Sequence, residues 1–200
     1  MEWDKFVVLD YLDTFKLVDE AFIEKDTGLS RERLLNILLD LSRRGLIKKV
    51  NNQWQIEKAG EREIEKYRQK LLENSKIKNI ILEYCKDFEE LNKKFKELVT
   101  RWQIKEKDGV MVPNDHSDPE YDLAIIEQLR LIHEETKKLL IKISNIIPVY
   151  KRYISRFEKA LKLLMDGNIE YMDLARNSYH NIWFELHESL LKLSGMKRIE

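Results

Sequence analysis

The segment spanning residues 14–60 limits the fold most, because it places turn residues between runs of regular periodicity. Gly28 can adopt a positive φ and end one helix. Ser30 can cap the next helix by accepting a hydrogen bond from a free N–H in its first turn. Apolar residues then recur at helical spacing over 34–41, and Gly45 stops that helix. The segment therefore predicts two helices joined by a tight turn.

A short β-hairpin is predicted directly after the second helix. Residues 46–50 lead into one strand, and 53–56 read as the return strand. Asn51 and Asn52 between them can adopt the pair of positive φ angles that a tight hairpin turn requires. Helix, tight turn, second helix and hairpin in this order resemble the MarR-like winged-helix family. The resemblance covers about the first third of the chain and implies an N-terminal winged helix-turn-helix.

Charge in this unit is uneven, which bears on whether it binds DNA. Residues 1–70 hold 14 basic and 14 acidic side chains, whereas residues 28–50 have a local surplus of four positive charges. Phosphate binding needs such a patch. Glu32 within the patch and the short wing, which has no arginine, favour the alternative of a module for packing or protein contact. The predicted residues for binding double-stranded DNA are Arg31, Arg33, Asn36, Arg43, Arg44 and Lys48.

Composition narrows the class of protein. The 200 residues carry no formal net charge, and glycine and proline are scarce, at 6 and 3, which predicts a mostly α fold. The single cysteine, Cys85, excludes an internal disulfide framework and fits a reducing, cytoplasmic location. The acidic N-terminal segment 1–13 resembles neither a signal peptide nor a transmembrane span. No stretch reaches about 18 uninterrupted apolar residues, so no membrane association is expected.

A second, helical domain is predicted after the hairpin. We place the boundary near residue 74, with a winged-helix domain and connecting helix at 1–74 and an antiparallel four-helix bundle at 75–200. Capping residues and apolar stripes at the 3.6-residue period support this division. The predicted inward stripes are Cys85, Phe88, Asn92, Phe95, Val99 and Trp102 in one helix, and Tyr150, Tyr153, Phe157, Leu161 and Leu164 in another. The expected helices are 57–74, 75–104, 119–147, 148–167 and 172–193, and a loop is expected at 105–117.

The last predicted helix carries polar residues on an apolar face. Arg176, His180 and His187 share one face with Trp183 and Phe184. Burial of an unpaired arginine is costly, so internal carboxylates or a bound anion must answer it. Glu185 and Glu188 point off this face and are poorer first partners. The candidate ligand-binding residues are Trp102, Asp115, His116, Tyr121, His133, Arg176, His180, Trp183 and His187.

Three interpretations of the histidines stay open. They are core residues bonded to carboxylates, part of a pocket for a small anion, or part of a metal or catalytic site. His180 and His187 lie two turns apart, roughly 10 Å along the axis, which is too far for one ion. Neither Glu-x-x-His nor His-x-x-x-His occurs. We therefore predict no metal, cofactor or catalytic residue, and an enzymatic activity is left open.

Longer motifs indicate a second resemblance. These are Asn114-Asp115-His116-Ser117-Asp118, Tyr121-Asp122, His133, and Tyr179-His180 running through Trp183-Phe184-Glu185-Leu186-His187-Glu188. With the winged helix in front, they resemble a family of uncharacterised bacterial proteins associated with genes for phosphoenolpyruvate-synthase-like or pyruvate-phosphate-dikinase-like enzymes. The resemblance implies a regulator or accessory partner of such an enzyme.

The observations together favour one function and leave an alternative. The favoured function is a homodimeric winged-helix transcriptional regulator that binds DNA and whose helical domain senses a small anionic metabolite. Dimerisation follows from the fold class, because two-fold proteins bind two half-sites. The alternative is an accessory subunit, without DNA binding, of an enzyme that transfers phosphate and handles phosphoenolpyruvate or pyruvate.

Overall fold

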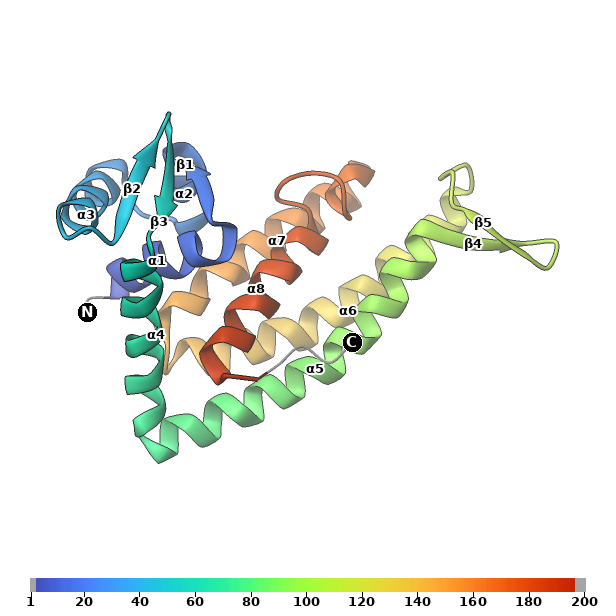
Figure 1. Ribbon diagram of the computed structural model, residues 1–200. Coiled ribbons are helices and arrows are strands. Elements are labelled where there is room, and N and C mark those ends of the chain that lie inside the picture. The colour runs from blue at the N-terminus through green and yellow to red at the C-terminus, as the bar shows by residue number, and fades with distance from the viewer. Residues whose placement is uncertain (1–2, 197–200) are drawn as a thin grey trace.

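A computed structural model describes residues 3–196, and within that range the chain is mostly α-helical with two small antiparallel sheets (Figure 1). This confirms the predicted mostly α class. The α-helices are α1 Trp3–Phe15, α2 Glu20–Thr27, α3 Arg31–Arg43, α4 Lys58–Glu73, α5 Ser75–Gln103, α6 Pro119–Ser144, α7 Lys151–Met165 and α8 Tyr179–Ser194. The strands are β1 Leu17–Asp19, β2 Ile47–Val50, β3 Gln53–Ile56, β4 Ile104–Lys107 and β5 Val110–Pro113. Short 3-10 turns are η1 Pro148–Tyr150 and η2 Ile169–Tyr171. The outermost residues of the two predicted domains, 1–2 and 197–200, lie outside the described range.

The N-terminal part combines α1, α2 and α3 with a three-stranded sheet of order β1-β3-β2. Gly28 ends α2 at a φ of 72°, and the Ser30 side chain accepts a hydrogen bond from the Arg33 N–H at the start of α3. The β2–β3 turn contains Asn51 at a φ of 54°. The break at Gly28 and the cap at Ser30 agree with the sequence prediction. The expected pair of positive φ angles in the β2–β3 turn is wrong, because Asn51 has one and Asn52 does not.

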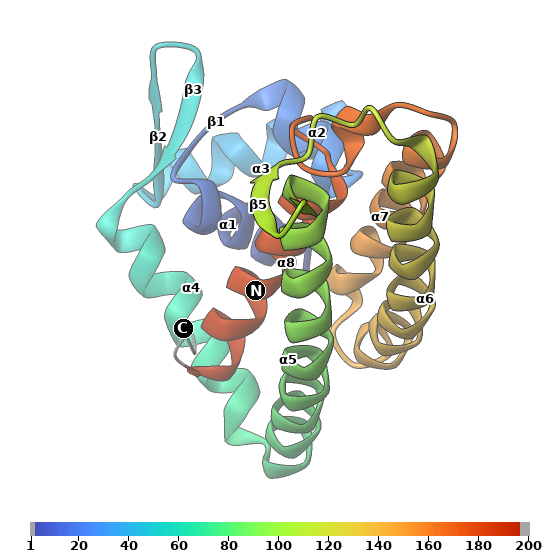
Figure 2. The same ribbon diagram turned by 90° about the vertical axis from the view of Figure 1, so that its right-hand side faces the viewer.

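The C-terminal helices lie side by side. α5 and α6 run as two long antiparallel helices, and α7 and α8 pack between them and the N-terminal part (Figures 1 and 2). Asn74 caps α5 by accepting hydrogen bonds from two N–H groups of its first turn. Asp118 caps α6 in the same way, with Pro119 in the first turn. Caps of this kind fix where each helix begins, and so position the side chains described below.

Two sequence expectations in this region are wrong. The segment 105–117 is not only a loop, because β4 and β5 form a hairpin there with Ile104 opposite Pro113. Its turn is Asp108-Gly109, and both residues have positive φ angles, of 53° and 77°, as a two-residue hairpin turn requires. The last helix begins at Tyr179 instead of near Met172, because the Ser178 side chain caps it by accepting the Asn181 N–H.

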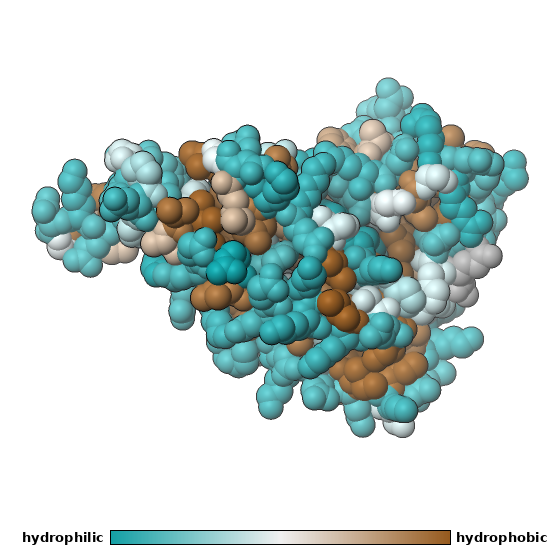
Figure 3. Space-filling model, turned by 180° about the vertical axis from the view of Figure 1, so that it is seen from behind, coloured by the Kyte–Doolittle hydropathy of each residue, from teal (hydrophilic) through white to brown (hydrophobic). Residues whose placement is uncertain are grey.

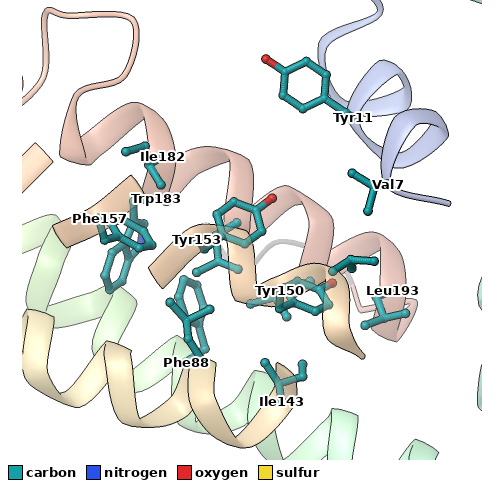
Figure 4. Packing of buried hydrophobic residues seen from close by; sticks show 14 of the residues in the cluster. Val7, Tyr11, Phe88, Ile143, Tyr150, Tyr153, Phe157, Ile182, Trp183 and Leu193 are labelled. Carbon is teal, nitrogen blue, oxygen red and sulfur yellow. The ribbon is translucent and has the colours of Figure 1, made fainter. Parts of the chain in front are cut away.

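One hydrophobic cluster runs through both predicted domains. Trp183 of α8 stacks on Phe88 and Phe95 of α5, with ring centroids 4.9 and 4.3 Å apart. Figure 4 shows Tyr150, Tyr153 and Phe157 in a row along one face of the chain from η1 into α7. The apolar stripes predicted for α5 and α7 are buried, so the 3.6-residue period identified the inward faces correctly.

The face of the molecule seen from behind is mainly hydrophilic (Figure 3). Viewed from behind, hydrophobic side chains form separate small patches among hydrophilic ones (Figure 3). Over residues 3–196, no helix is both long and apolar enough to span a bilayer.

Candidate functional site

The predicted DNA-binding residues lie on α3, at its C-terminal end and on β2. Arg31, Asn36 and Arg43 are exposed on α3. The first of these arginines pairs with an acidic side chain of α2, because Arg31 Nη1 lies 3.4 Å from Glu24 Oε2. Arg33 Nε lies 3.0 Å from Asp4 of α1. Both arginines at the start of α3 therefore have acidic partners within the same unit.

The basic residues at the other end of the patch have acidic partners too. Arg44 Nη2 lies 3.2 Å from Glu63 of α4, and Lys48 Nζ lies 2.7 Å from Glu57. The neighbouring Lys49 lies 2.8 Å from a Glu20 carboxylate oxygen. The acidic partners from outside residues 28–50 are Asp4, Glu20, Glu24, Glu57 and Glu63. Lys5 is a basic partner from outside the segment, since its Nζ lies 2.9 Å from Asp40. The surplus of four positive charges, the five carboxylates and Lys5 together give a net charge of zero, so this set of side chains has no positive excess.

The candidate ligand-binding residues fall into separate places, and the first group lies beside the β4–β5 hairpin. His116 Nδ1 lies 2.9 Å from Asp122 Oδ2, and its ring packs on Trp102 with centroids 4.5 Å apart. Asn114 donates a hydrogen bond to the other Asp122 oxygen at 2.9 Å and a second one to the Trp102 carbonyl. His116 also has a φ of 55°, a region in which histidine is enriched. The cluster thus ties the hairpin to the start of α6.

Asp115 and Tyr121 also form hydrogen bonds where the β4–β5 hairpin meets the start of α6. Asp115 accepts hydrogen bonds from Lys105 at 2.5 Å and from the Ser117 hydroxyl at 2.7 Å. These hydrogen bonds hold the pKa of Asp115 well below its usual range. The Tyr121 hydroxyl donates to the Arg101 carbonyl at 2.9 Å. Asp115 and Tyr121 therefore have partners within the chain, and neither lines any of the cavities described below.

The second group lines an aromatic groove between α5 and α8, with a volume of about 550 Å³. Trp183 Nε1 donates to Asn92 Oδ1 at 2.9 Å, and His187 Nε2 lies 2.5 Å from Glu89 Oε1. His180 lines the groove without a recorded ring hydrogen bond to the described residues, and burial lowers its pKa. The lining residues are Asn92, Phe95, Lys96, Val99, Thr100, Gln103, His180, Trp183, Phe184 and His187.

His133 lies deeper, within the bundle. Its Nδ1 is 3.3 Å from the Tyr179 hydroxyl. Burial lowers the pKa of this imidazole, so the ring is neutral near pH 7. His133 lines neither the aromatic groove nor the cavity beside Arg176. This geometry matches that of a core histidine with a polar partner.

Arg176 does not share a helical face with His180, because α8 begins only at Tyr179. Its guanidinium carbon lies 3.5 Å from the centre of the Phe22 ring on α2. It lines a cavity of about 220 Å³ that is distinct from the aromatic groove. The prediction that Arg176 shares one helix face with His180 and His187 is therefore wrong.

A buried ionic network that is not predicted from the sequence joins α1, α4 and α8. Arg68 of α4 is 3% exposed and donates to Asp10 Oδ1 at 2.8 Å and to Asp13 Oδ2 at 3.0 Å. Lys192 Nζ of α8 lies 3.0 Å from the same Asp13 oxygen. The Ser189 hydroxyl of α8 donates to Asp10 Oδ2 at 2.9 Å. Polar side chains of α1, α4 and α8 are thus joined inside the protein.

Glu185 extends this network to α7. It is 1% exposed and lies 3.2 Å from Arg152 Nη2 and 2.6 Å from Arg156 Nη1. The Tyr153 hydroxyl donates to it at 3.0 Å. Glu185 was expected to be a poor partner for Arg176 and the histidines, and the structure shows that its own partners lie on α7. The sequence does contain a signal for this part of the network. Arg152 and Arg156 lie four residues apart and flank Tyr153 of the predicted apolar stripe.

Comparisons with known proteins add no relative to this picture. No family model, no curated protein and no solved structure matches the chain.

Proposed function

We propose that this chain is a regulatory protein whose N-terminal unit is a winged helix that contacts another protein instead of duplex DNA. The order of helices and strands, the β1-β3-β2 sheet and the β2–β3 hairpin support the winged-helix assignment. In the same proposal, α5 to α8 form the antiparallel bundle. Fold alone does not decide what such a unit binds, so the side chains on its surface must.

The acidic partners of the α3 patch carry this proposal. DNA affinity depends on basic side chains that replace the counterions of phosphates. Arg31, Arg33 and Arg44 already lie within 3.4 Å of carboxylates. A duplex would bring further negative charge to a surface without a positive excess. That surface favours a neutral or mixed-charge partner such as another protein.

α3 also presents apolar area suited to a protein partner. Leu39 is 51% exposed, and Leu35 lies one turn earlier, half-buried. Residues at this spacing share one helix face. An apolar pair surrounded by compensated charges resembles the centre and rim of a protein interface. The resemblance to the bacterial family makes a phosphoenolpyruvate- or pyruvate-handling enzyme the first partner to test.

The aromatic groove supports the sensing part of the proposal. Lys96 and His180 both line the groove. Lys96 supplies a cation, and the His180 ring forms no hydrogen bond within residues 3–196. The stacked Trp183 and Phe95 rings provide a rigid apolar wall. A small anionic metabolite carrying an apolar part fits these groups, so we place metabolite sensing in this groove.

Isothermal titration calorimetry with the purified phosphoenolpyruvate-synthase-like enzyme of the same organism tests the proposed function. We expect a stable complex that Leu39→Glu weakens at least tenfold. Leu131→Glu is the matched control, because Leu131 is similarly exposed, at 59%, but lies on α6. Absence of binding by the folded wild type would contradict the enzyme as partner. Equal weakening by both variants would contradict the α3 surface as the contact.

DNA binding by a homodimer is the second candidate. Arg31, Asn36 and Arg43 are exposed on α3, the helix that would enter the major groove. Exposed ion pairs contribute at most about 1 kcal/mol each, so phosphates can compete for the arginines. The two candidates therefore differ in a measurable quantity, the affinity for duplex DNA and its dependence on salt.

A further inference from the structure

A small cavity lies where α1 and α2 meet the C-terminal helices. Its volume is about 220 Å³. It shares only Phe184 with the lining of the aromatic groove, so it is a separate space. The lining residues are Phe15, Asp26, Arg156, Arg176, Asn181, Phe184 and Glu185.

The cavity is lined by charges of both signs. Asp26 and Glu185 are 3% and 1% exposed, and Arg156 is largely buried as well. Arg176 lies at the exposed end of the lining, over the Phe22 ring. Arg156 lies between the two carboxylates, 2.6 Å from Glu185 and 3.9 Å from Asp26. Arg176 adds a second guanidinium group to the same lining.

Two buried polar groups of this lining lack hydrogen bonds to the part of the chain that the structure describes. Asp26 Oδ2 accepts the Tyr11 hydroxyl at 2.5 Å, but Asp26 Oδ1 has no hydrogen-bond partner. Arg156 Nη1 lies 2.6 Å from Glu185, but Arg156 Nε has none. Buried donors and acceptors without partners are uncommon and costly. One acceptor and one donor at the same cavity point to a guest that supplies the complementary groups.

The charges select the class of guest. A simple anion would meet the carboxylates of Asp26 and Glu185, and a simple cation would meet the guanidinium groups of Arg156 and Arg176. A zwitterion avoids both repulsions, because its cationic end can face a carboxylate while its carboxylate faces an arginine. Phe15 and Phe184 leave apolar wall for a small side chain.

The volume limits the size of the guest. A water molecule takes about 30 Å³ of liquid volume, so 220 Å³ corresponds to about seven water-sized groups. Glycine, alanine and serine have five to seven non-hydrogen atoms, which is close to the number of water-sized groups that this volume holds. We therefore take these three amino acids as the first guests to test.

We propose that this cavity binds a small α-amino acid, with its ammonium group paired with Asp26 and its carboxylate paired with Arg176. Asp26 belongs to α2, and Arg176 precedes α8. The bound amino acid therefore bridges the N-terminal part to the C-terminal helices and strengthens their contact. The inference does not depend on whether α3 contacts a protein or DNA.

Calorimetric titration of the full chain with glycine, alanine and serine tests the site. Propionate and ethylamine serve as probes that carry only one of the two charged groups. We expect saturable binding of at least one amino acid, and at least tenfold weaker binding of both single-charge probes. If propionate binds as tightly as the amino acids, the site recognises anions and the proposal is wrong. Absence of binding by all three amino acids at ~10 mM, ten times a dissociation constant of about 1 mM, would overturn the proposal.

Variants place the binding in this cavity. Arg176→Ala should weaken binding at least tenfold and leave the fold intact, because Arg176 is exposed. Asp26→Asn tests the ammonium partner, and its fold is checked by far-ultraviolet circular dichroism. Arg130→Ala is the matched control, since Arg130 pairs with Glu127 on the outer face of α6. Unchanged affinity in Arg176→Ala would overturn the proposal even if Asp26→Asn fails to fold.

Discussion

Arg68 holds α4 against α1 through charged groups that water does not reach, and replacing it tests this network. Its guanidinium is 3% exposed and lies within 3.0 Å of carboxylate oxygens of Asp10 and Asp13. Arg68→Ala leaves two buried carboxylates with fewer partners. Removal of one member of a buried ion pair costs about 3–5 kcal/mol. We expect that loss in the free energy of unfolding, which is a large share of the roughly 5–15 kcal/mol typical of a domain.

Urea denaturation followed by circular dichroism measures this loss. With a urea dependence of about 1–3 kcal/mol per molar, the midpoint should fall by at least about 1 M. Arg130→Ala is the control, because its pair with Glu127 is exposed and should contribute at most about 1 kcal/mol. If Arg68→Ala shifts the midpoint no more than the control, the network does not stabilise the contact between α1 and α4.

Three further predictions follow from single residues. Burial raises the pKa of Asp13, but hydrogen bonds from Lys16 and Lys192 outweigh this effect and hold the pKa at about 2. Because this pKa lies below the unfolded value of about 3.9, about 2 kcal/mol of the stability present above pH 4 should be lost as the pH falls toward 2. The urea midpoint of Asp13→Asn should not show this loss. Gly60→Ala should destabilise by about 1–3 kcal/mol in a thermal melt, because its Cβ would lie 2.2 Å from a backbone oxygen; an unchanged melting temperature would contradict that close approach. Burial raises the pKa of Cys85 to about 11, so a thiol reagent at pH 8 should modify it rapidly only in urea, and rapid labelling of the native protein would refute its burial.

Features that depend on neighbours in the sequence were predictable. The apolar stripe that includes Phe88, Phe95 and Trp102 is buried on α5 as its period predicts. The cap at Ser30 and the break at Gly28 also lie where the sequence places them. The Asp108-Gly109 turn was equally local and predicts a hairpin, so the expectation of a loop there missed an available signal.

Features that depend on distant parts of the chain were not predictable. Arg33 and its partner Asp4 are separated by 29 residues and Arg68 and Asp10 by 58, so no periodicity connects them. The local surplus of positive charge in the sequence therefore did not predict the net charge of the folded α3 surface. Because Ser178 caps α8, the helix begins after Arg176, which therefore lies outside it. The candidate ligand residues consequently lie in several places instead of one pocket.

Domain independence is also decided by distant contacts. The predicted boundary at residue 74 lies at Asn74, between α4 and α5. The Ser189 hydroxyl of α8 donates a hydrogen bond to Asp10 of α1, and Lys192 of α8 forms an ion pair with Asp13 of α1. These bonds cross the boundary through the interior. The division into two domains stays a prediction that expression of residues 75–200 alone can test.

The affinity of the full chain for duplex DNA shows whether the α3 surface can bind phosphates. We infer that acidic partners leave the α3 surface without the positive excess that phosphate binding needs. Fluorescence anisotropy with a labelled duplex from the protein's own upstream region at ~50 mM salt, where phosphate contacts are strongest, measures it. We predict no saturable binding by the folded protein. Tight binding that weakens steeply with salt, and that Arg31→Ala reduces, would contradict the claim.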